Sequence, residues 1–269
     1  MRAAVFLGGG RITAALLAGL RLAKYKAPVV VHDRNPHKLR ALKKEFGVAV
    51  EPDLLRAVRQ ARLLIVAVRP DDVEGVLRRL RETRAKLAFV ACSLAAGIPL
   101  ANLHKMLGPP MRWARAMPSP VARFGRGLTG LAFQARFPHA DRTLVRNFFS
   151  QVGEVVVIPE RQFDPFTVTY SASHGYHALA ALARAAHDLG LEEKMARAAA
   201  AHALGDAIVA WRDGKEPLDA LLGEAATPGG IAATVMNSMD QDGFQQIISR
   251  ALKAGVARAR QNAKVGRAR

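Results

Sequence analysis

The sequence predicts an α/β protein in which a doubly wound, mostly parallel sheet is followed by an all-helical domain. Three observations predict this class. Short, continuously apolar segments alternate with segments of helical spacing over residues 1–160. A glycine-rich turn, Gly8–Gly10, joins the first two segments. From residue 161 to residue 269 the strand pattern ends, and Ala- and Leu-rich helical spacing replaces it.

The N-terminal half alternates strands and helices without a hairpin signal. Its apolar runs are typical of strands buried on both faces of a parallel sheet. Pro36 suits the first turn of a helix, Gly47 suits its end, and Asp53 is placed to cap the next helix. The expected strands are 3–8, 29–31, 48–50, 63–68, 87–92, 111–117, 128–132 and 154–157. The expected helices are 12–25, 36–46, one from residue 53, 70–81, 100–107 and 142–152.

The C-terminal part shows helical spacing only. We expect helices at 164–190, 192–213, 217–223 and 229–263. Long Ala-rich helices of this apolarity often pack against a partner chain, which predicts a homodimer. The expected domains are therefore a sheet domain at 1–160 and a helical dimerisation domain at 161–269.

Composition narrows the classes of partner. The net charge is +18 over 269 residues, but the basic residues are spread along the whole chain and aromatic residues make up only 6%, which argues against nucleic acid as the partner. The charge does favour anionic small molecules. Cys92 is the single cysteine, so an intrachain disulfide is excluded and a cytoplasmic location is expected. No apolar run approaches the roughly 20 residues of a membrane helix, so we expect no membrane association.

The glycine turn predicts a dinucleotide site. Gly8 suits the tight turn after the first strand, and Gly10 suits close approach of the backbone to a pyrophosphate. Arg11 and Ile12 open the following helix, whose N-terminus offers free N–H donors and a partial positive charge. Thr13 stands where the fingerprint of the Rossmann fold has glycine or alanine, and should pack less closely.

Three residues after the second strand bear on the choice of cofactor. Asp33 could accept hydrogen bonds from the adenosine ribose hydroxyls, which favours NAD(H). Arg34 could pair with a 2′-phosphate, which favours NADP(H), or could simply face water. Asn35 could donate to either cofactor. We expect NADP(H), with NAD(H) as the alternative.

The end of the fourth strand is a second candidate part of this site. Val68, Arg69 and Pro70 lie where ligands bind a parallel sheet, at its carboxyl edge. This turn could line the ribose and nicotinamide, or it could be an ordinary connection between a strand and a helix.

Several motifs in order resemble the pyrroline-5-carboxylate reductase family. They are the glycine turn, Val68-Arg69-Pro70, Ser93-Leu94-Ala95-Ala96-Gly97-Ile98, Arg115-Ala116-Met117-Pro118, Thr227-Pro228-Gly229-Gly230 and Gly243-Phe244. The resemblance spans nearly the whole chain. It implies a cytoplasmic reductase of proline biosynthesis that passes a hydride from NAD(P)H to the C=N bond of a cyclic imino acid. It also implies a helical domain that interlocks into dimers, which often assemble further.

The resemblance assigns the substrate carboxylate to one helix N-terminus, which is physically apt for an anion. The substrate-binding residues it implies are Thr227, Pro228, Gly229, Gly230, Ile231 and Ala232. One departure is Ala232, where the family has a hydroxyl that bonds the substrate; losing that bond costs about 1.5–3 kcal/mol, and Thr227 could partly substitute.

Other departures fall at 170–175, where larger residues replace glycines, at Ser119-Pro120-Val121, and at Lys215. They leave three readings open: the same substrate, a related imine or 2-keto acid, or a dinucleotide sensor without turnover.

Candidate proton donors lie at the start of the helical domain. His174 and His177 are one helical turn apart, with Tyr170 a further turn back, and histidine titrates near neutral pH. Together with Thr227, Tyr170 and His174 are the catalytic candidates; the alternative is a polar helix face. We see no third ligand that would make the histidine pair a metal site, so no metal is expected. Cys92 falls in a buried strand and should act as a small apolar side chain.

Overall fold

The computed structural model describes residues 2–82 and 89–265 and divides them into two compact units. The first comprises Met1–Tyr170 with Ala254–Arg269, and the second comprises Ser171–Lys253. The predicted residues 87–88 of one strand and 266–269 of the C-terminal tail lie outside the described part of the chain.

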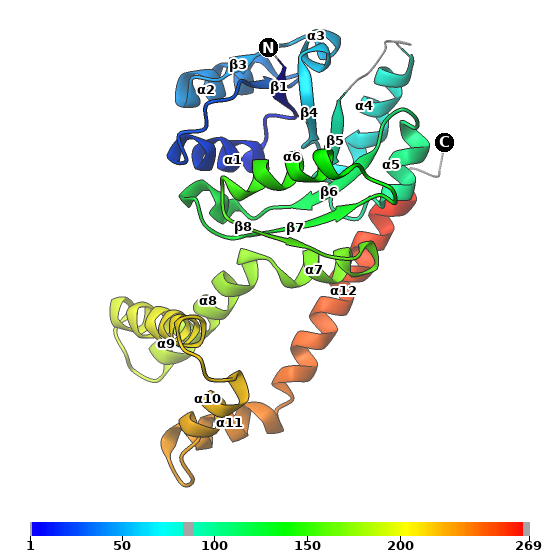
Figure 1. Ribbon diagram of the computed structural model, residues 1–269. Coiled ribbons are helices and arrows are strands. Elements are labelled where there is room, and N and C mark those ends of the chain that lie inside the picture. Colours follow the sequence, from blue (N-terminus) through cyan, green and yellow to red (C-terminus); the bar gives the residue numbers. More distant parts are fainter. Residues whose placement is uncertain (1, 83–88, 266–269) are drawn as a thin grey trace. The chain divides into compact units, whose positions relative to one another are not determined.

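The first unit contains an eight-stranded sheet of order β3-β2-β1-β4-β5-β6-β7-β8 (Figure 1). Its strands are β1 Ala3–Leu7, β2 Val29–His32, β3 Ala49–Val50, β4 Ala61–Val66, β5 Val90–Ser93, β6 Trp113–Met117, β7 Leu128–Phe133 and β8 Glu154–Val157. All neighbours are parallel except β6 and β7, which pair antiparallel with Met117 opposite Gly130. The mostly parallel sheet of the predicted fold class is confirmed.

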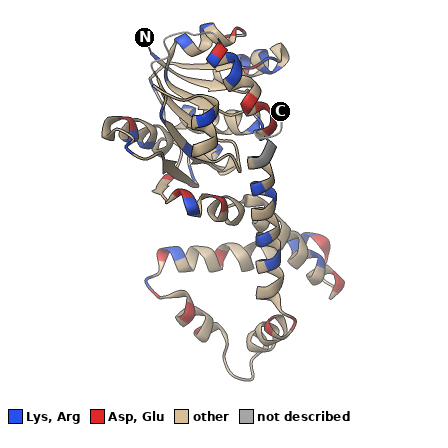
Figure 2. Cartoon of the chain, turned by 90° about the vertical axis from the view of Figure 1, so that its right-hand side faces the viewer, with Lys and Arg blue, Asp and Glu red and all other residues tan. Residues whose placement is uncertain are grey.

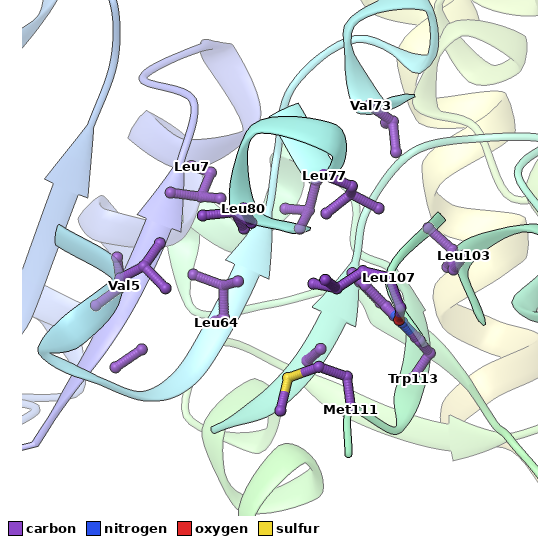
Figure 3. Packing of buried hydrophobic residues seen from close by; sticks show 14 of the residues in the cluster. Val5, Leu7, Leu64, Val73, Leu77, Leu80, Leu103, Leu107, Met111 and Trp113 are labelled. Carbon is purple, nitrogen blue, oxygen red and sulfur yellow. The ribbon is translucent and has the colours of Figure 1, made fainter. Parts of the chain in front are cut away.

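Helices cover both faces of this sheet. They are α1 Arg11–Leu22, α2 Pro36–Phe46, α3 Leu54–Arg59, α4 Pro70–Glu82, α5 Leu100–Met106, α6 His139–Ser150 and α7 Phe163–Thr169, with short 3₁₀ helices η1 Pro120–Phe124 and η2 Glu160–Gln162. One buried cluster joins alternate strand residues such as Val5 and Leu7 to α3, α4 and α5 (Figure 3). The other joins Ala4 and Phe6 to α1, α2 and α6. Successive residues of β1 thus face opposite sides of the sheet, and both sides are buried. All residues of this strand are therefore apolar.

Local capping chemistry sets several of these boundaries. The Asn35 side chain accepts hydrogen bonds from the first turn of α2, and Gly47 ends that helix in a left-handed conformation. Asp53 caps α3 by accepting from the backbone N–H of Arg56, as the sequence predicts.

The described residues of the second unit form helices joined by turns, and no strand lies among them. It contains α8 Ala172–Asp188, α9 Glu193–Asp213, α10 Leu218–Ala225, α11 Ile231–Gln241 and the first part of α12 Phe244–Val265. Two predicted helices are wrong as single helices. The segment 164–190 breaks at Tyr170–Ser171, and 229–263 breaks at Gly243, whose φ is +74°.

The end of α12 belongs to the first unit and docks beside α5 (Figure 1). A Cβ on Gly97 would lie 2.2 Å from the Ala259 carbonyl oxygen, so only glycine allows the two backbones to approach this closely. Asn102 donates to the Ala263 carbonyl at 3.0 Å, and Asn262 donates to the Ala96 carbonyl at 3.3 Å. The motif at 93–98 therefore receives the C-terminal helix.

Basic side chains are distributed over elements of both units, as the sequence indicates (Figure 2). Among the helices described, none combines the length and the apolarity needed to cross a membrane.

Candidate active site

The glycine turn lies between β1 and α1, at the carboxyl edge of the parallel strands. Gly8 has φ +112°, and a Cβ there would lie 2.7 Å from the Ala67 carbonyl oxygen, so glycine is required. Gly10 precedes α1 without a side-chain cap, and a Cβ there would meet nothing within 4 Å. Open space beside the uncapped first turn, with Arg11 exposed, suits a pyrophosphate.

Thr13 closes this turn by a hydrogen bond that the sequence analysis did not foresee. Its hydroxyl is fully buried and donates to the Gly8 carbonyl oxygen at 2.6 Å. The threonine thus ties the residue after β1 to the first turn of α1, in place of the close packing that a glycine would give.

Asp33, the residue after β2, holds the glycine turn by hydrogen bonds. Its Oδ2 accepts from the Gly9 backbone N–H at 2.7 Å, and its Oδ1 accepts from the Asn35 N–H at 2.8 Å. The Lys38 ammonium lies 3.7 Å from Oδ2, and Asp33 is only 9% exposed. Each carboxylate oxygen already has a backbone donor, so the carboxylate holds the loop, whether or not it also accepts from a ribose.

Arg34 and Asn35 make different contacts. Arg34 is exposed and pairs with Asp72 in the first turn of α4 at 3.2 Å. The Asn35 side-chain oxygen caps α2, accepting from the backbone N–H groups of His37 at 2.9 Å and Lys38 at 3.4 Å. Together with Lys38, Arg34 puts positive charge near the N-terminus of α2.

Val68, Arg69 and Pro70 connect β4 to α4. The predicted strand runs two residues too far, because β4 ends at Val66. Val68 and Pro70 are partly buried and Arg69 is exposed. The sheet order places this connection beside the glycine turn, at the same edge.

The second unit holds the Thr227–Gly230 turn. Gly229 has φ +77°, the Gly230 N–H donates to the Thr227 carbonyl at 2.9 Å, and Gly230 precedes α11 without a side-chain cap. Ile231 is 87% exposed and Ala232 is also exposed. The first N–H groups of α11 are therefore open to an anion. Thr234, which the sequence analysis did not single out, donates its hydroxyl to the Gly230 carbonyl at 3.1 Å.

The catalytic candidates fall in different elements. Tyr170 ends α7 in the first unit, and its hydroxyl oxygen accepts from the Leu128 backbone N–H at 2.6 Å. His174 and His177 are exposed on α8 in the second unit, where Thr227 is also exposed. The helical spacing that linked Tyr170 to His174 is wrong, because the chain leaves the helix at Tyr170 and Ser171.

Cys92 is fully buried in β5, and burial raises the pKa of its thiol far above its ordinary value. Such a thiol is a poor nucleophile. Residues 2–82 and 89–265 bring together no group of three or more His, Cys, Asp or Glu that could hold a metal ion.

Arg115 forms a buried ion-pair network that the sequence analysis missed. Its guanidinium pairs with Glu160 and with Asp164, each at 3.0 Å, and lies 4.1 Å from the centre of the Phe163 ring. Glu160 also accepts from the Leu100 backbone N–H at 3.0 Å. The network ties η2 and α7 to β6 and α5. Three acidic and basic residues spaced by up to 49 positions leave no local sequence signal.

Comparison with known proteins finds an oxidoreductase or reductase family for each part of the chain. Residues 4–94 match the family "NADP oxidoreductase coenzyme F420-dependent", and residues 160–262 match "Pyrroline-5-carboxylate reductase dimerisation". The chain is 29% identical to pyrroline-5-carboxylate reductase of Mycobacterium leprae, over 95% of each chain. It is also 29% identical to that of Pseudomonas aeruginosa, over 94% of each chain.

Solved structures share the fold at lower identity. A pyrroline-5-carboxylate reductase of Coxiella burnetii has a TM-score of 0.86 at 24% identity, over 97% of this chain and 98% of that one. Plasmodium falciparum pyrroline carboxylate reductase, solved with NADP bound, has a TM-score of 0.85 at 19% identity, over 98% of each chain.

Proposed function

Because this chain belongs to the pyrroline-5-carboxylate reductase family, we propose that it reduces 1-pyrroline-5-carboxylate to L-proline, with NADPH as the favoured reductant and NADH as the alternative. This is a step of proline biosynthesis. The observation that carries the proposal is the glycine turn, where the open Gly10 and the uncapped α1 suit a pyrophosphate. Relatives named for this reaction align over nearly the whole chain, which supports the same chemistry.

The cofactor residues have distinct tasks in this proposal. The backbone of Gly8 and Gly10, with the first N–H groups of α1 at Arg11 and Ile12, binds the pyrophosphate. Arg34 and Asn35 bind the adenosine ribose and its 2′-phosphate, while Asp33 holds the loop in shape. Val68, Arg69 and Pro70 line the ribose and nicotinamide. Bound there, the nicotinamide supplies the hydride.

The substrate carboxylate binds the N-terminus of α11. The turn is formed by Thr227, Pro228, Gly229 and Gly230. The backbone N–H groups of Ile231 and Ala232 are accessible hydrogen-bond donors, because no side chain caps the start of α11 and both residues are exposed. The N-terminus of α11 positions the substrate and neutralises its charge. This is the main task left to the protein when the cofactor carries the hydride.

Proton transfer is assigned to three candidate groups. His174 is exposed on α8, so its imidazole is accessible to a ligand. The Tyr170 hydroxyl accepts one backbone hydrogen bond and still has its own proton to donate. Thr227 offers a hydroxyl at the turn itself. A protonated imine needs little further acid catalysis, so each replacement should lower turnover modestly.

The active form is a homo-oligomer, at least a dimer, in the cytoplasm. The second unit buries mainly alanines, such as Ala183, Ala196 and Ala200, while Leu189 is 89% and Tyr176 is 68% exposed. Helices without an apolar core of their own need a partner surface. The match to a dimerisation family over 160–262 supports a second copy as that partner. The single cysteine fits a reducing compartment.

The test is the loss of reduced-nicotinamide absorbance with 1-pyrroline-5-carboxylate, using NADPH and NADH in parallel. Saturable turnover with a lower KM for NADPH is expected. Ala232→Thr should lower the KM for the imino acid because it restores a hydroxyl at the carboxylate site. Ala225→Thr, an exposed position at the end of α10, is the matched control. Absence of turnover in every variant refutes the proposal.

A second candidate is a dinucleotide sensor or a reductase of another imine or a 2-keto acid. Ala232 favours it, since the site lacks a side-chain donor to the substrate at this position. Tight NADPH binding with no consumption of 1-pyrroline-5-carboxylate, in wild type and Ala232→Thr alike, would favour it over the first.

A further inference from the structure

An ion pair crosses the edge of the sheet above the glycine turn. The sheet order places β1 between β2 and β4, so the connections that follow β2 and β4 lie on either side of this turn. Arg34 follows β2, Asp72 lies in the first turn of α4 after β4, and their side chains meet at 3.2 Å. Two segments 38 residues apart in sequence are thereby joined beside the dinucleotide site.

The pair is accessible to a ligand. The Arg34 side chain is 83% exposed and the Asp72 side chain is 36% exposed. Asp72 stands near the N-terminus of α4, where the helix dipole favours its negative charge. Arg34 is therefore held by a carboxylate that is itself stabilised, and its charge is partly neutralised in the free protein.

A 2′-phosphate and Asp72 compete for the same guanidinium. Arg34 adjoins the N-terminus of α2, with Lys38 one turn further along, and these are the positive charges that a 2′-phosphate at this edge would meet. A ribose without the 2′-phosphate carries no charge that would compete with Asp72 for the Arg34 guanidinium. The pair therefore affects the two cofactors unequally.

We propose that Asp72 is a specificity-determining residue, which holds Arg34 in an ion pair and so limits the preference for a 2′-phosphorylated dinucleotide. This rests on the proposed function, because it requires the dinucleotide to bind at the glycine turn. Asp72 acts through Arg34 and is a positioning residue. The effect is modest, because exposed ion pairs are weak, and it diminishes as salt screens the charges.

The experiment measures binding directly and does not depend on turnover. Adenosine 2′,5′-bisphosphate and adenosine 5′-monophosphate are titrated into the full-length protein by calorimetry. Asp72→Asn is expected to tighten binding of the bisphosphate by about threefold to fivefold, with binding of the monophosphate unchanged. The gain should shrink in high salt.

Asp71→Asn is the matched control. Asp71 precedes Asp72 in the same helical turn, is exposed, and makes no ion pair with Arg34 in the described structure. Asp71→Asn removes the same charge but leaves the Arg34–Asp72 ion pair intact. It should therefore leave the ratio of the two affinities nearly unchanged. An equal gain from Asp71→Asn would overturn the proposal in favour of a general charge effect.

A double-mutant cycle tests whether Asp72 acts through Arg34. Arg34→Gln should weaken binding of the bisphosphate, and Asp72→Asn should give no further gain in that background. A full gain without Arg34, or no gain in wild type, overturns the inference while leaving the proposed function intact. Failure of both ligands to bind wild type refutes the dinucleotide site and with it the inference.

Discussion

Replacing Arg115 by methionine tests whether the buried ion pairs hold η2 and α7 on the sheet. The Arg115 side chain is 2% exposed, whereas its partners Glu160 and Asp164 are 35% and 23% exposed. Methionine keeps much of the apolar stem that packs on Phe163. It removes the positive charge and leaves two carboxylates without their partner.

The expected cost follows from this burial. Removing one partner of a buried pair typically costs about 3–5 kcal/mol. Both carboxylates here are partly exposed, and Glu160 keeps its hydrogen bond from Leu100. We therefore expect the lower end, about 3 kcal/mol, which corresponds to a fall in Tm of roughly 6–12 °C for a chain of this size.

The assay is thermal unfolding followed by circular dichroism, at one protein concentration because association shifts Tm. Arg161→Met, an exposed arginine in η2, is the matched control and should change Tm little. Adding Glu160→Gln and Asp164→Asn to Arg115→Met should recover at least half of the loss, because no buried charge is then unpaired. If Arg115→Met unfolds together with the control variant, the network does not stabilise this fold and the reasoning fails.

Three further changes test the turn, the docked helix and the buried thiol. Gly10→Ala should leave Tm unchanged, since its Cβ meets nothing within 4 Å, yet weaken NADPH binding by at least about tenfold because that space lies against the ligand; unchanged binding would contradict this. Gly97→Ala should destabilise the chain by about 2 kcal/mol or more and speed proteolysis of α12, because its φ is +78° and its Cβ would strike the Ala259 carbonyl. The raised pKa of Cys92 means that the unfolded thiol ionises first, so its contribution to stability is present below its unfolded pKa and is lost as pH rises. From about pH 8 to about pH 10, wild type should lose roughly 1–2 kcal/mol more stability than Cys92→Ala, as measured by urea unfolding, and equal losses would refute the assignment.

The sheet half could be predicted because its signals are local. Each strand is a short apolar run, and residues such as Asn35 and Gly47 mark helix ends by their own side chain or backbone preference. The antiparallel pairing of β6 with β7 could not be predicted. Its connection passes through η1 and turns at Gly125, so it carries none of the two-residue hairpin pattern that signals such a pair.

The site could be predicted only in part, because its contacts depend on how separate elements approach one another. Sequence spacing identifies Gly8 and Gly10, but it does not show that Asp33 bonds the Gly9 N–H or that Thr13 bonds the Gly8 carbonyl. These contacts depend on how β2 and α1 approach the turn. In the second unit, helical spacing predicts the helices, but the breaks at Tyr170 and Gly243 depend on backbone conformation that Ala-rich composition does not reveal.

The motif glycines separate into two kinds by the space around them, and the distinction bears on what each motif does. At Gly8 and Gly97 a Cβ would meet a backbone carbonyl at 2.7 Å and 2.2 Å, so these glycines let one part of the chain approach another. At Gly10 and Gly229 a Cβ would meet nothing within 4 Å, so packing within the chain does not explain them. Gly229 still needs its positive φ of +77°, but Gly10 has φ −84°, a conformation that any residue adopts. Of the four, Gly10 is therefore the glycine whose small size is best explained by a ligand approaching the backbone.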